Sequence, residues 1–271
     1  MRILFLGDVV GQPGRNAIKA FVPALRVSED LDFVIANGEN ACAGKGIDPK
    51  TALDIFSGGV DVITGGNHSW DKKDVIPYIE SEPRLLRPAN YPKVPPQYSA
   101  PTPGRGSIIL EKNGARLAVL NLMGRVHMEP VLECPFQAAI HWIDHFKREG
   151  IHNILIDFHA EATSEKQAFA HFLAGKVSAV LGSHTHVQTA DERILEGPLG
   201  TTAYITDAGM TGPYDSVIGM KKEISIARFL NKMPARFEAA ERKAGLHGVI
   251  VEIDSSNGSA SSIRRISMFM D

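Results

Sequence analysis

Short, β-rich apolar runs alternate with amphipathic stretches along most of the chain. The runs occupy residues 2–8, 32–40, 60–68, 152–161, 177–187 and 201–210. Helix-like segments lie between most of them, at 14–27, 49–56, 71–81, 134–149 and 164–174. Alternation of this kind is typical of sheets with parallel strands whose faces are covered by helices.

Two further stretches predict antiparallel pairs. Residues 106–124 form a hairpin pattern around the two-residue turn Asn113-Gly114, and the C-terminal runs 246–254 and 262–270 form the last pair. The helix pattern and the hairpins together indicate an α/β fold or a mixed sandwich.

We expect a single domain over residues 1–271. No Ser/Gly-rich linker or charge block divides the chain. Segment 83–106 contains seven prolines and is predicted to be an extended connection. Asp48 is predicted to cap the helix that follows it, with Pro49 at the first helical position.

Composition narrows the classes of partner. The formal net charge is −2, which favours neither duplex nucleic acid nor an anionic membrane as a partner. The first apolar run reaches Asp8 before any cleavage-like site and is too short to span a bilayer. Cys42 and Cys134 form no CxxC pair, so we expect two free thiols and a cytoplasmic location.

Polar residues able to bind metal follow the ends of five successive predicted strands. They are Asp8; Glu39 with Asn40; Asn67 with His68; His159; and His184 with His186. Because ligands collect beyond the carboxyl ends of strands in α/β sheets, residues more than 100 positions apart can meet there.

Each of these features alone has an ordinary structural explanation. Asp8 could be a turn or helix-cap residue, and Gly-Gly-Asn before His68 could be a turn. His159 could be a surface histidine, or one whose hydrogen bonds are satisfied within the protein. The opening loop "GDVVGQPG" could cradle a phosphate, but it lacks the GxGxxG spacing and the Lys-Ser/Thr pair of a Walker loop. The five coincidences together favour a shared site.

A metal centre explains the residue types. Carboxylate, amide and imidazole ligands suit Mn, Fe or Zn. Two divalent ions would leave the centre positive beside Asp8 and Glu39, so it would attract phosphate, and two such ions can activate a water for attack on a phosphoester. Glu39 is the natural candidate to bridge them.

His68 cannot easily face the same metal as its neighbour Asn67. We therefore assign it as the general acid that protonates the leaving oxygen, after attack by a metal-bound hydroxide. Asp71 could orient His68, although the helix pattern favours Asp71 as a helix cap.

The ordered set "GD" (7–8), "GEN" (38–40), "GGNH" (65–68), His159 and "GSHTH" (182–186) resembles the calcineurin-like metallophosphoesterases. Two departures, Val10 in place of a histidine and Glu39 in place of an aspartate, resemble the YmdB-type subgroup. "GDVVGQPGR", "NLMGR" and "DAGMTGP" are similar to that subgroup too. The resemblance implies an α/β fold built as a two-sheet β-sandwich flanked by helices, which is a four-layer αββα sandwich.

The resemblance also implies the ligand sets. One metal would be held by Asp8, Glu39, Asn40 and His186, and the other by Glu39, Asn67, His159 and His184. The subgroup is associated with 2′,3′-cyclic nucleotide phosphodiesterase activity, with iron or manganese, and with bacterial regulation of motility and biofilms.

A binuclear phosphodiesterase acting on a small phosphodiester is therefore the leading hypothesis. A phosphomonoesterase on nucleotides or phosphoproteins, and a regulatory metal-binding protein that acts through partner contacts, are the alternatives. Arg125 is a candidate phosphate contact, against a solvated or structural role. A homo-oligomer is compatible with the sequence, which specifies no interface.

Overall fold

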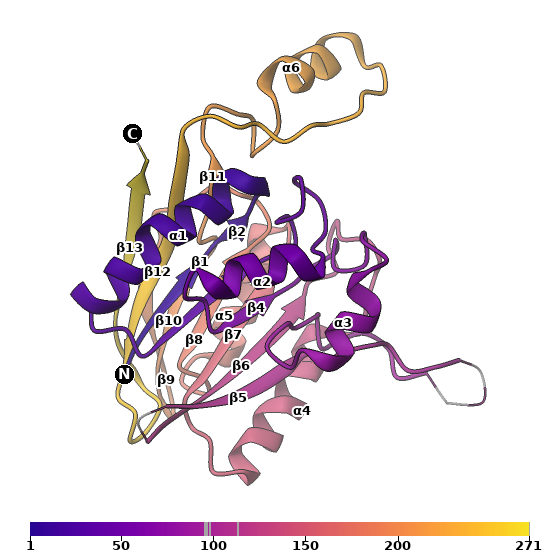
Figure 1. Cartoon of the computed structure of the whole chain (residues 1–271). Helices are drawn as coiled ribbons and strands as arrows, with labels where there is room; N and C mark the ends of the chain where they lie inside the picture. Colours follow the sequence, from indigo (N-terminus) through magenta and orange to yellow (C-terminus); the bar gives the residue numbers. More distant parts are fainter. Residues whose placement is uncertain (95–96, 98, 113, 271) are drawn as a thin grey trace.

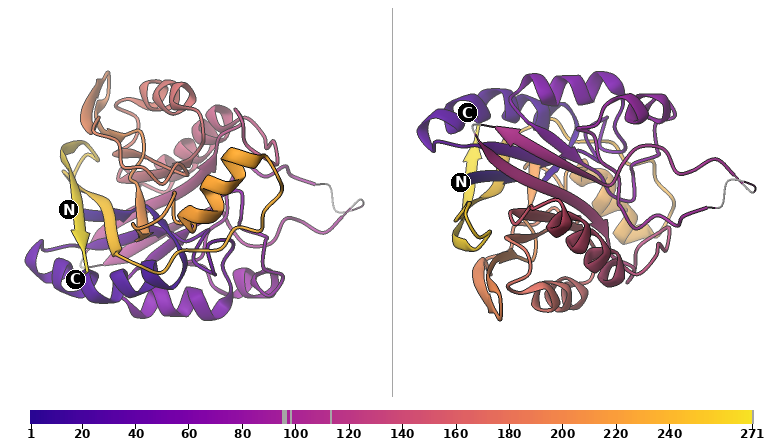
Figure 2. Two further views of the ribbon diagram at one scale, coloured as in Figure 1. Left: turned by 90° about the horizontal axis from the view of Figure 1, so that it is seen from above. Right: turned by 90° about the horizontal axis from the view of Figure 1, so that it is seen from below.

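Two β-sheets pack face to face in the computed structural model, and helices cover their outer faces (Figure 1). The structure describes residues 1–94, 97, 99–112 and 114–270. Figure 2 shows the layers edge-on, with helices outside each sheet. The predicted αββα sandwich is confirmed.

The first sheet is mixed and has seven strands. They are β1 (Arg2–Leu6), β2 (Asp8–Val9), β3 (Phe33–Asn37), β4 (Val62–Thr64), β11 (Met210–Pro213), β12 (Ala244–Ile253) and β13 (Ala260–Phe269). Their order is β2-β11-β12-β1-β3-β4, with β13 also paired to β12. β1, β3 and β4 run parallel, and β12 with β13 forms the antiparallel C-terminal pair that the sequence predicts.

The second sheet has six strands in the order β5-β6-β7-β8-β10-β9. They are β5 (Ser107–Lys112), β6 (Ala115–Met123), β7 (Ile154–His159), β8 (Ala179–Ser183), β9 (Arg193–Gly197) and β10 (Gly200–Ile205). The four central strands are parallel, and β5 and β9 are antiparallel edges. The predicted β5–β6 hairpin is confirmed, while Asn113 of its turn lies outside the described residues.

All helices of the described residues except the last cover one of the two sheets. The helices are α1 (Gly11–Ser28), α2 (Pro49–Ser57), α3 (Val75–Ser81), α4 (Pro135–Arg148), α5 (Thr163–Leu173) and α6 (Lys222–Asn231). The first three pack on the seven-stranded sheet, and α4 with α5 packs on the six-stranded sheet. Asp48 caps α2 as predicted: the backbone N of Thr51 donates to its carboxylate over 2.8 Å.

Strands buried on both faces build the core. In β1, Leu4 and Leu6 pack against the helices, whereas Ile3 and Phe5 face the opposite sheet. This alternation follows from the two-residue period of a strand. Because both faces are mostly apolar, the buried polar side chains lie mainly toward the carboxyl ends of the strands, where the site forms.

The run at 201–210, predicted as one strand, is divided between the sheets. β10 belongs to the six-stranded sheet and β11 to the seven-stranded sheet. The turn between β10 and β11 forms backbone hydrogen bonds with both sheets. Ala208 N donates to Gly182 O over 2.8 Å, and Asp8 N donates to Gly209 O over 3.0 Å. Gly209 permits this crossing because its φ is +90°.

Helix α6 and strand β9 are absent from the sequence prediction. α6 lies on an arm, residues 214–243, that projects beyond β11 (Figure 1). Ile226, Phe229 and Leu230 on this helix are exposed, so it has no buried stripe of the kind that periodicity detects. No helix among the described residues is both long enough and apolar enough to cross a bilayer. Cys42 and Cys134 are free thiols, as predicted.

His247 gives the fold a pH-dependent stability. Its ring packs beside those of Tyr214 and Phe269, with centroids 4.5 and 5.7 Å away. Burial, together with the charge of Arg265, lowers the pKa of His247 to about 4. The unfolded chain therefore binds more protons than the folded chain between about pH 4 and 6.5, and stability falls as the pH falls through this window.

We expect wild-type protein to lose about 1–2 kcal/mol of unfolding free energy from this group between pH 7 and pH 5. Urea titrations of wild type and His247→Gln at both pH values measure the effect. The variant should be less pH-sensitive by that amount. An identical pH dependence in both proteins would contradict the assignment.

Candidate metal centre

The predicted ligands meet at one edge of the sandwich. In the seven-stranded sheet, Asp8 lies just beyond β1 as the first residue of β2, Glu39 and Asn40 follow β3, and Asn67 follows β4. His159 ends β7, while His184 and His186 follow β8 in the six-stranded sheet. The carboxyl ends of these strands thus bring together side chains from both sheets.

One half of the site is centred on His159. Its Nε2 lies 3.1 Å from Glu39 Oε1, 3.1 Å from Asn67 Oδ1 and 3.1 Å from His184 Nδ1. The ligand atoms of Glu39, His159 and His184 lie within 4.8 Å of one another. These contacts join the four residues that the resemblance assigns to one metal.

The other half adjoins the same glutamate. Asn40 Nδ2 lies 3.1 Å from Glu39 Oε1 and 3.1 Å from His186 Nε2, and that nitrogen lies 3.7 Å from Asp8 Oδ1. Exchanging the O and N of the Asn40 amide places its oxygen toward the same two groups. Glu39 is therefore the residue common to both halves.

The site fits metal ions on two observations. Asp8 Oδ1 is fully buried and has no hydrogen-bond partner among the described residues, although a buried carboxylate oxygen is costly to leave unpaired. A Cβ added at Gly66 would lie 2.3 Å from Glu39 Oε2 and 2.4 Å from His159 Nε2, so only glycine leaves these ligand atoms free. Carboxylate, amide and imidazole donors suit Fe, Mn or Zn.

Burial and the close contacts between the ligands shift their pKa values. Burial raises the pKa of Asp8 to about 6. Burial opposes ionisation of Glu39 and His159 too, but their mutual attraction and hydrogen bond outweigh it, so the pKa of Glu39 falls to about 2 and that of His159 rises to about 9. Burial and the neighbouring His159 charge lower the pKa of His184 to about 3. A cation would favour the ionised Asp8 and the unprotonated His159.

His68 lies beside the ligands without belonging to either half. Its backbone N donates to Glu39 Oε2 over 2.9 Å, and its Nδ1 lies 2.9 Å from Asp71 Oδ2. Because α3 begins at Val75, Asp71 caps no helix, and the helix-cap interpretation of Asp71 is wrong. The residues before Val75 form a turn that brings Asp71 back onto the imidazole of His68.

The histidine loop after β8 is held in a strained conformation. His184 and His186 have φ of +106° and +65°, values that side chains other than glycine adopt at a cost of about 1–3 kcal/mol. His184 N donates to Asp8 Oδ2 over 2.9 Å, and His186 Nδ1 lies 2.8 Å from Ile218 O at the base of the arm. These contacts direct both rings toward the acidic ligands.

The pattern of the sequence does not reveal the supports of this loop. Asp207 Oδ2 accepts from Thr185 N over 3.0 Å and from Lys166 Nζ over 2.8 Å, and Lys166 also donates to Ser183 O over 2.7 Å. Lysines are rarely buried, yet Lys166 on α5 is only 1% exposed. Only the fold shows that it is paired.

The comparisons with known proteins agree with this geometry. The model of the YmdB-like protein family matches residues 4–266. The chain belongs to the YmdB-like protein family. A relative from Bacillus subtilis, named 2′,3′-cyclic-nucleotide 2′-phosphodiesterase, is 49% identical over 98% of this chain and 96% of its own length. The predicted resemblance to the YmdB-type subgroup is confirmed.

Solved structures of similar proteins share the whole fold. A hypothetical protein from Thermus thermophilus is 42% identical with a TM-score of 0.89, and the match covers 100% of both chains. A structure described as a novel phosphatase from Mycoplasma pneumoniae is 36% identical with a TM-score of 0.90, covering 100% of this chain and 94% of its own. The expectation that the chain is a phosphoesterase is confirmed by these family members.

Arg125, the predicted phosphate contact, lies just beyond β6. Its side chain is exposed, and its backbone N donates to Glu165 Oε1 over 3.0 Å. Gly124 N donates to His159 O over 3.0 Å, so this loop adjoins a ligand strand. The role of Arg125 stays a prediction.

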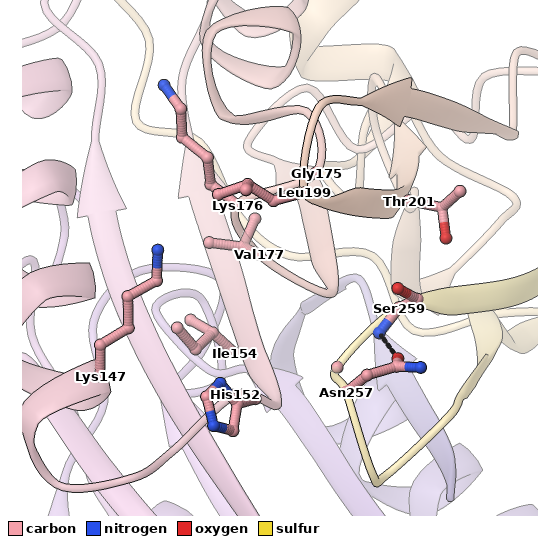
Figure 3. Close-up of a pocket in the computed structure, with 11 residues that line it drawn as sticks. Lys147, His152, Ile154, Gly175, Lys176, Val177, Leu199, Thr201, Asn257 and Ser259 are labelled. Carbon is pink, nitrogen blue, oxygen red and sulfur yellow. Dashed lines mark hydrogen bonds between the residues drawn. The ribbon is translucent and has the colours of Figure 1, made fainter.

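A cavity of about 190 Å³ lies at the opposite ends of the ligand-bearing strands. Figure 3 shows Lys147, His152 and Ser259 at its border. Ile154 and Val177 line it at the amino ends of β7 and β8. In this family member the cavity is therefore not part of the metal centre.

Proposed function

We propose that this chain is a metal-dependent phosphodiesterase that hydrolyses 2′,3′-cyclic nucleotides. The observation that carries the proposal is the convergence of the seven predicted ligands at one edge of the sandwich, with Asp8 Oδ1 buried and unpartnered among the described residues. The substrate class is supported by the printed name of the Bacillus subtilis relative. A cyclic phosphate is compact and needs no large docking surface. The free thiols Cys42 and Cys134 favour a cytoplasmic location.

Two ions, iron or manganese, would be held by the two halves of the site. Asp8, Glu39, Asn40 and His186 would hold one, and Glu39, Asn67, His159 and His184 the other. When bound, such a pair supplies Lewis acidity and a water of lowered pKa for in-line displacement at phosphorus.

The residues of the chain then decide binding and proton movement. Asp8 and Glu39 contribute only two negative charges, so the loaded site attracts an anionic phosphodiester. His68 holds a proton for the leaving oxygen, and Asp71 Oδ2, 2.9 Å from its Nδ1, orients the ring so that Nε2 is the donating atom.

A phosphomonoesterase is the second candidate. The Mycoplasma pneumoniae structure is described as a phosphatase, and the ligand set does not by itself distinguish diesters from monoesters. The loops beyond the strand ends, 124–133 and 209–220, would select the substrate.

Metal removal tests the proposal. Protein stripped with a chelator should lose hydrolysis of 2′,3′-cyclic AMP, and Mn²⁺ or Fe²⁺ should restore it with about two ions per chain. Parallel assays on linear diesters and monoesters rank the substrate classes. Activity that survives complete stripping, or a chain that binds neither ion, would refute the metal-dependent function. Preference for monoesters would favour the second candidate.

A further inference from the structure

A chain of buried hydrogen bonds runs beneath His159. Asp157 and Ser183 are fully buried between the sheets, as is His159 itself. Ser183 Oγ donates to Asp157 Oδ1 over 2.6 Å, and His159 Nδ1 lies 2.9 Å from the same hydroxyl. Neither Asp157 nor Ser183 belongs to the ligand sets above.

The residues that contact the other oxygen of Asp157 determine which atoms donate and which accept in these hydrogen bonds. Glu39 N donates to Asn37 Oδ1 over 3.1 Å, which fixes the orientation of the Asn37 amide. Asn37 Nδ2 therefore donates, over 3.0 Å to Asp157 Oδ2 and over 3.1 Å to Gly65 O. The Thr64 hydroxyl also contacts Asp157 Oδ2. Asp157 thus accepts through both oxygens.

The hydrogen bond from Ser183 to Asp157 determines where the imidazole of His159 carries its proton. Since the hydroxyl hydrogen of Ser183 is committed to Asp157, its oxygen can only accept from His159. Asn37 Nδ2 also lies 3.3 Å from His159 Nδ1, but both of its hydrogens are already donated to Asp157 and Gly65. When a metal ion displaces the proton that Nε2 shares with Glu39, the remaining ring proton is retained at Nδ1 and the Nε2 lone pair is free. That Nε2 faces Glu39 Oε1 and Asn67 Oδ1, each 3.1 Å away.

We infer that Asp157, acting through Ser183, is a positioning residue that holds His159 as the Nδ1–H tautomer and presents its Nε2 lone pair to the metal. The inference rests on the proposed metal-binding function. Buried partners of this kind commonly fix the tautomer and orientation of a histidine ligand. Here a hydroxyl lies between the carboxylate and the ring.

The substitution Asp157→Asn tests the direction of the hydrogen bonds that link Asp157, Ser183 and His159. Because Asn37 must keep an acceptor at the Oδ2 position, the new amide nitrogen takes the Oδ1 position and donates to Ser183. The hydroxyl then donates to His159 Nδ1, which moves the ring proton to Nε2 and blocks the lone pair. An aspartate-to-asparagine change beneath a catalytic histidine inverts its tautomer in the same way in serine proteases.

Mn²⁺ titration of stripped protein measures the effect. We expect wild type to bind about two ions, and Asp157→Asn to lose about 10–100-fold of its affinity at one of the two sites. Ser183→Ala should weaken the same site although it removes no charge. It therefore distinguishes an effect of the His159 tautomer from the loss of the negative charge of Asp157. Histidine-¹⁵N-labelled protein is examined at a concentration of diamagnetic Zn²⁺ that just saturates wild type. The wild-type His159 should then carry its proton at Nδ1 with Nε2 metal-bound, whereas in Asp157→Asn the ring should stay unmetallated with its proton at Nε2.

Asn153→Ala is the matched control. Asn153 is also buried, adjoins the other end of β7, and donates to Arg116 O over 2.9 Å and Ser255 O over 3.3 Å. It should bind two ions as wild type does. Wild-type affinity at both sites in Asp157→Asn and Ser183→Ala would overturn the inference alone. A wild-type chain without metal would overturn the proposed function, and the inference with it.

Discussion

Replacing Glu39 by glutamine is expected to remove both metal ions and to lower phosphodiester turnover by about 10³–10⁵-fold, equivalent to several kcal/mol of transition-state stabilisation. Glu39 Oε1 lies 3.1 Å from Asn40 Nδ2 in one half of the site and 3.1 Å from His159 Nε2 in the other. The amide keeps the size of the side chain but removes one of the site's two negative ligand charges. Elemental analysis of the purified variant measures the metal per chain.

Glu252→Gln is the control for this change. It is chemically the same substitution, on a half-exposed glutamate that pairs with Arg2 over 2.8 Å at the start of β1. It should keep both ions and full turnover. Tight binding of two ions by Glu39→Gln would contradict the role of Glu39 as the shared ligand.

Replacing His68 by alanine is expected to lower turnover of 2′,3′-cyclic nucleotides by about 10²–10⁴-fold while both ions are retained. The ring of His68 contacts Asp71 through Nδ1 and approaches the ligand set only at the amide nitrogen of Asn67, 3.3 Å from its Nε2. Alanine keeps the backbone N that donates to Glu39 Oε2 over 2.9 Å. The site should therefore stay assembled and lose only the proton donor. Metal content and turnover are measured on the same preparation.

The leaving group distinguishes a lost acid from a distorted site. An activated diester such as bis(4-nitrophenyl) phosphate needs little protonation, so His68→Ala should lose far less activity on it than on a cyclic nucleotide. His141→Ala, an exposed histidine on α4, is the control and should match wild type on both substrates. Equal losses on both substrates would contradict the assignment of His68 as general acid.

Much of the site could be predicted because its parts are local. Each ligand stands directly after an apolar run, so residues such as Asp8 and His159 could be recognised without knowledge of the strand order. The parallel direction of the strands then brings their carboxyl ends to one edge. The fold class followed from the same alternation of runs and helices.

Other features could not be read from local pattern. The division of residues 201–210 between two sheets depends on backbone bonds to partners far away in the sequence. Asp71 has the sequence context of a helix cap, but α3 begins at Val75 and the carboxylate contacts His68 instead. The burial of Lys166 depends on its pairing with Asp207, which lies 41 positions away in the sequence.

By itself, then, the sequence determined most of the strands and helices, though not α6 or β9, and which side chains stand at the strand ends, because these depend on periodicity and neighbouring residues. Only the tertiary structure decided how those side chains are supported. Asp157 and Asn37 are 120 positions apart and meet only because two separate sheets pack face to face. Direction along a hydrogen-bond chain depends on every donor and acceptor in that buried space, and no stretch of sequence contains them all.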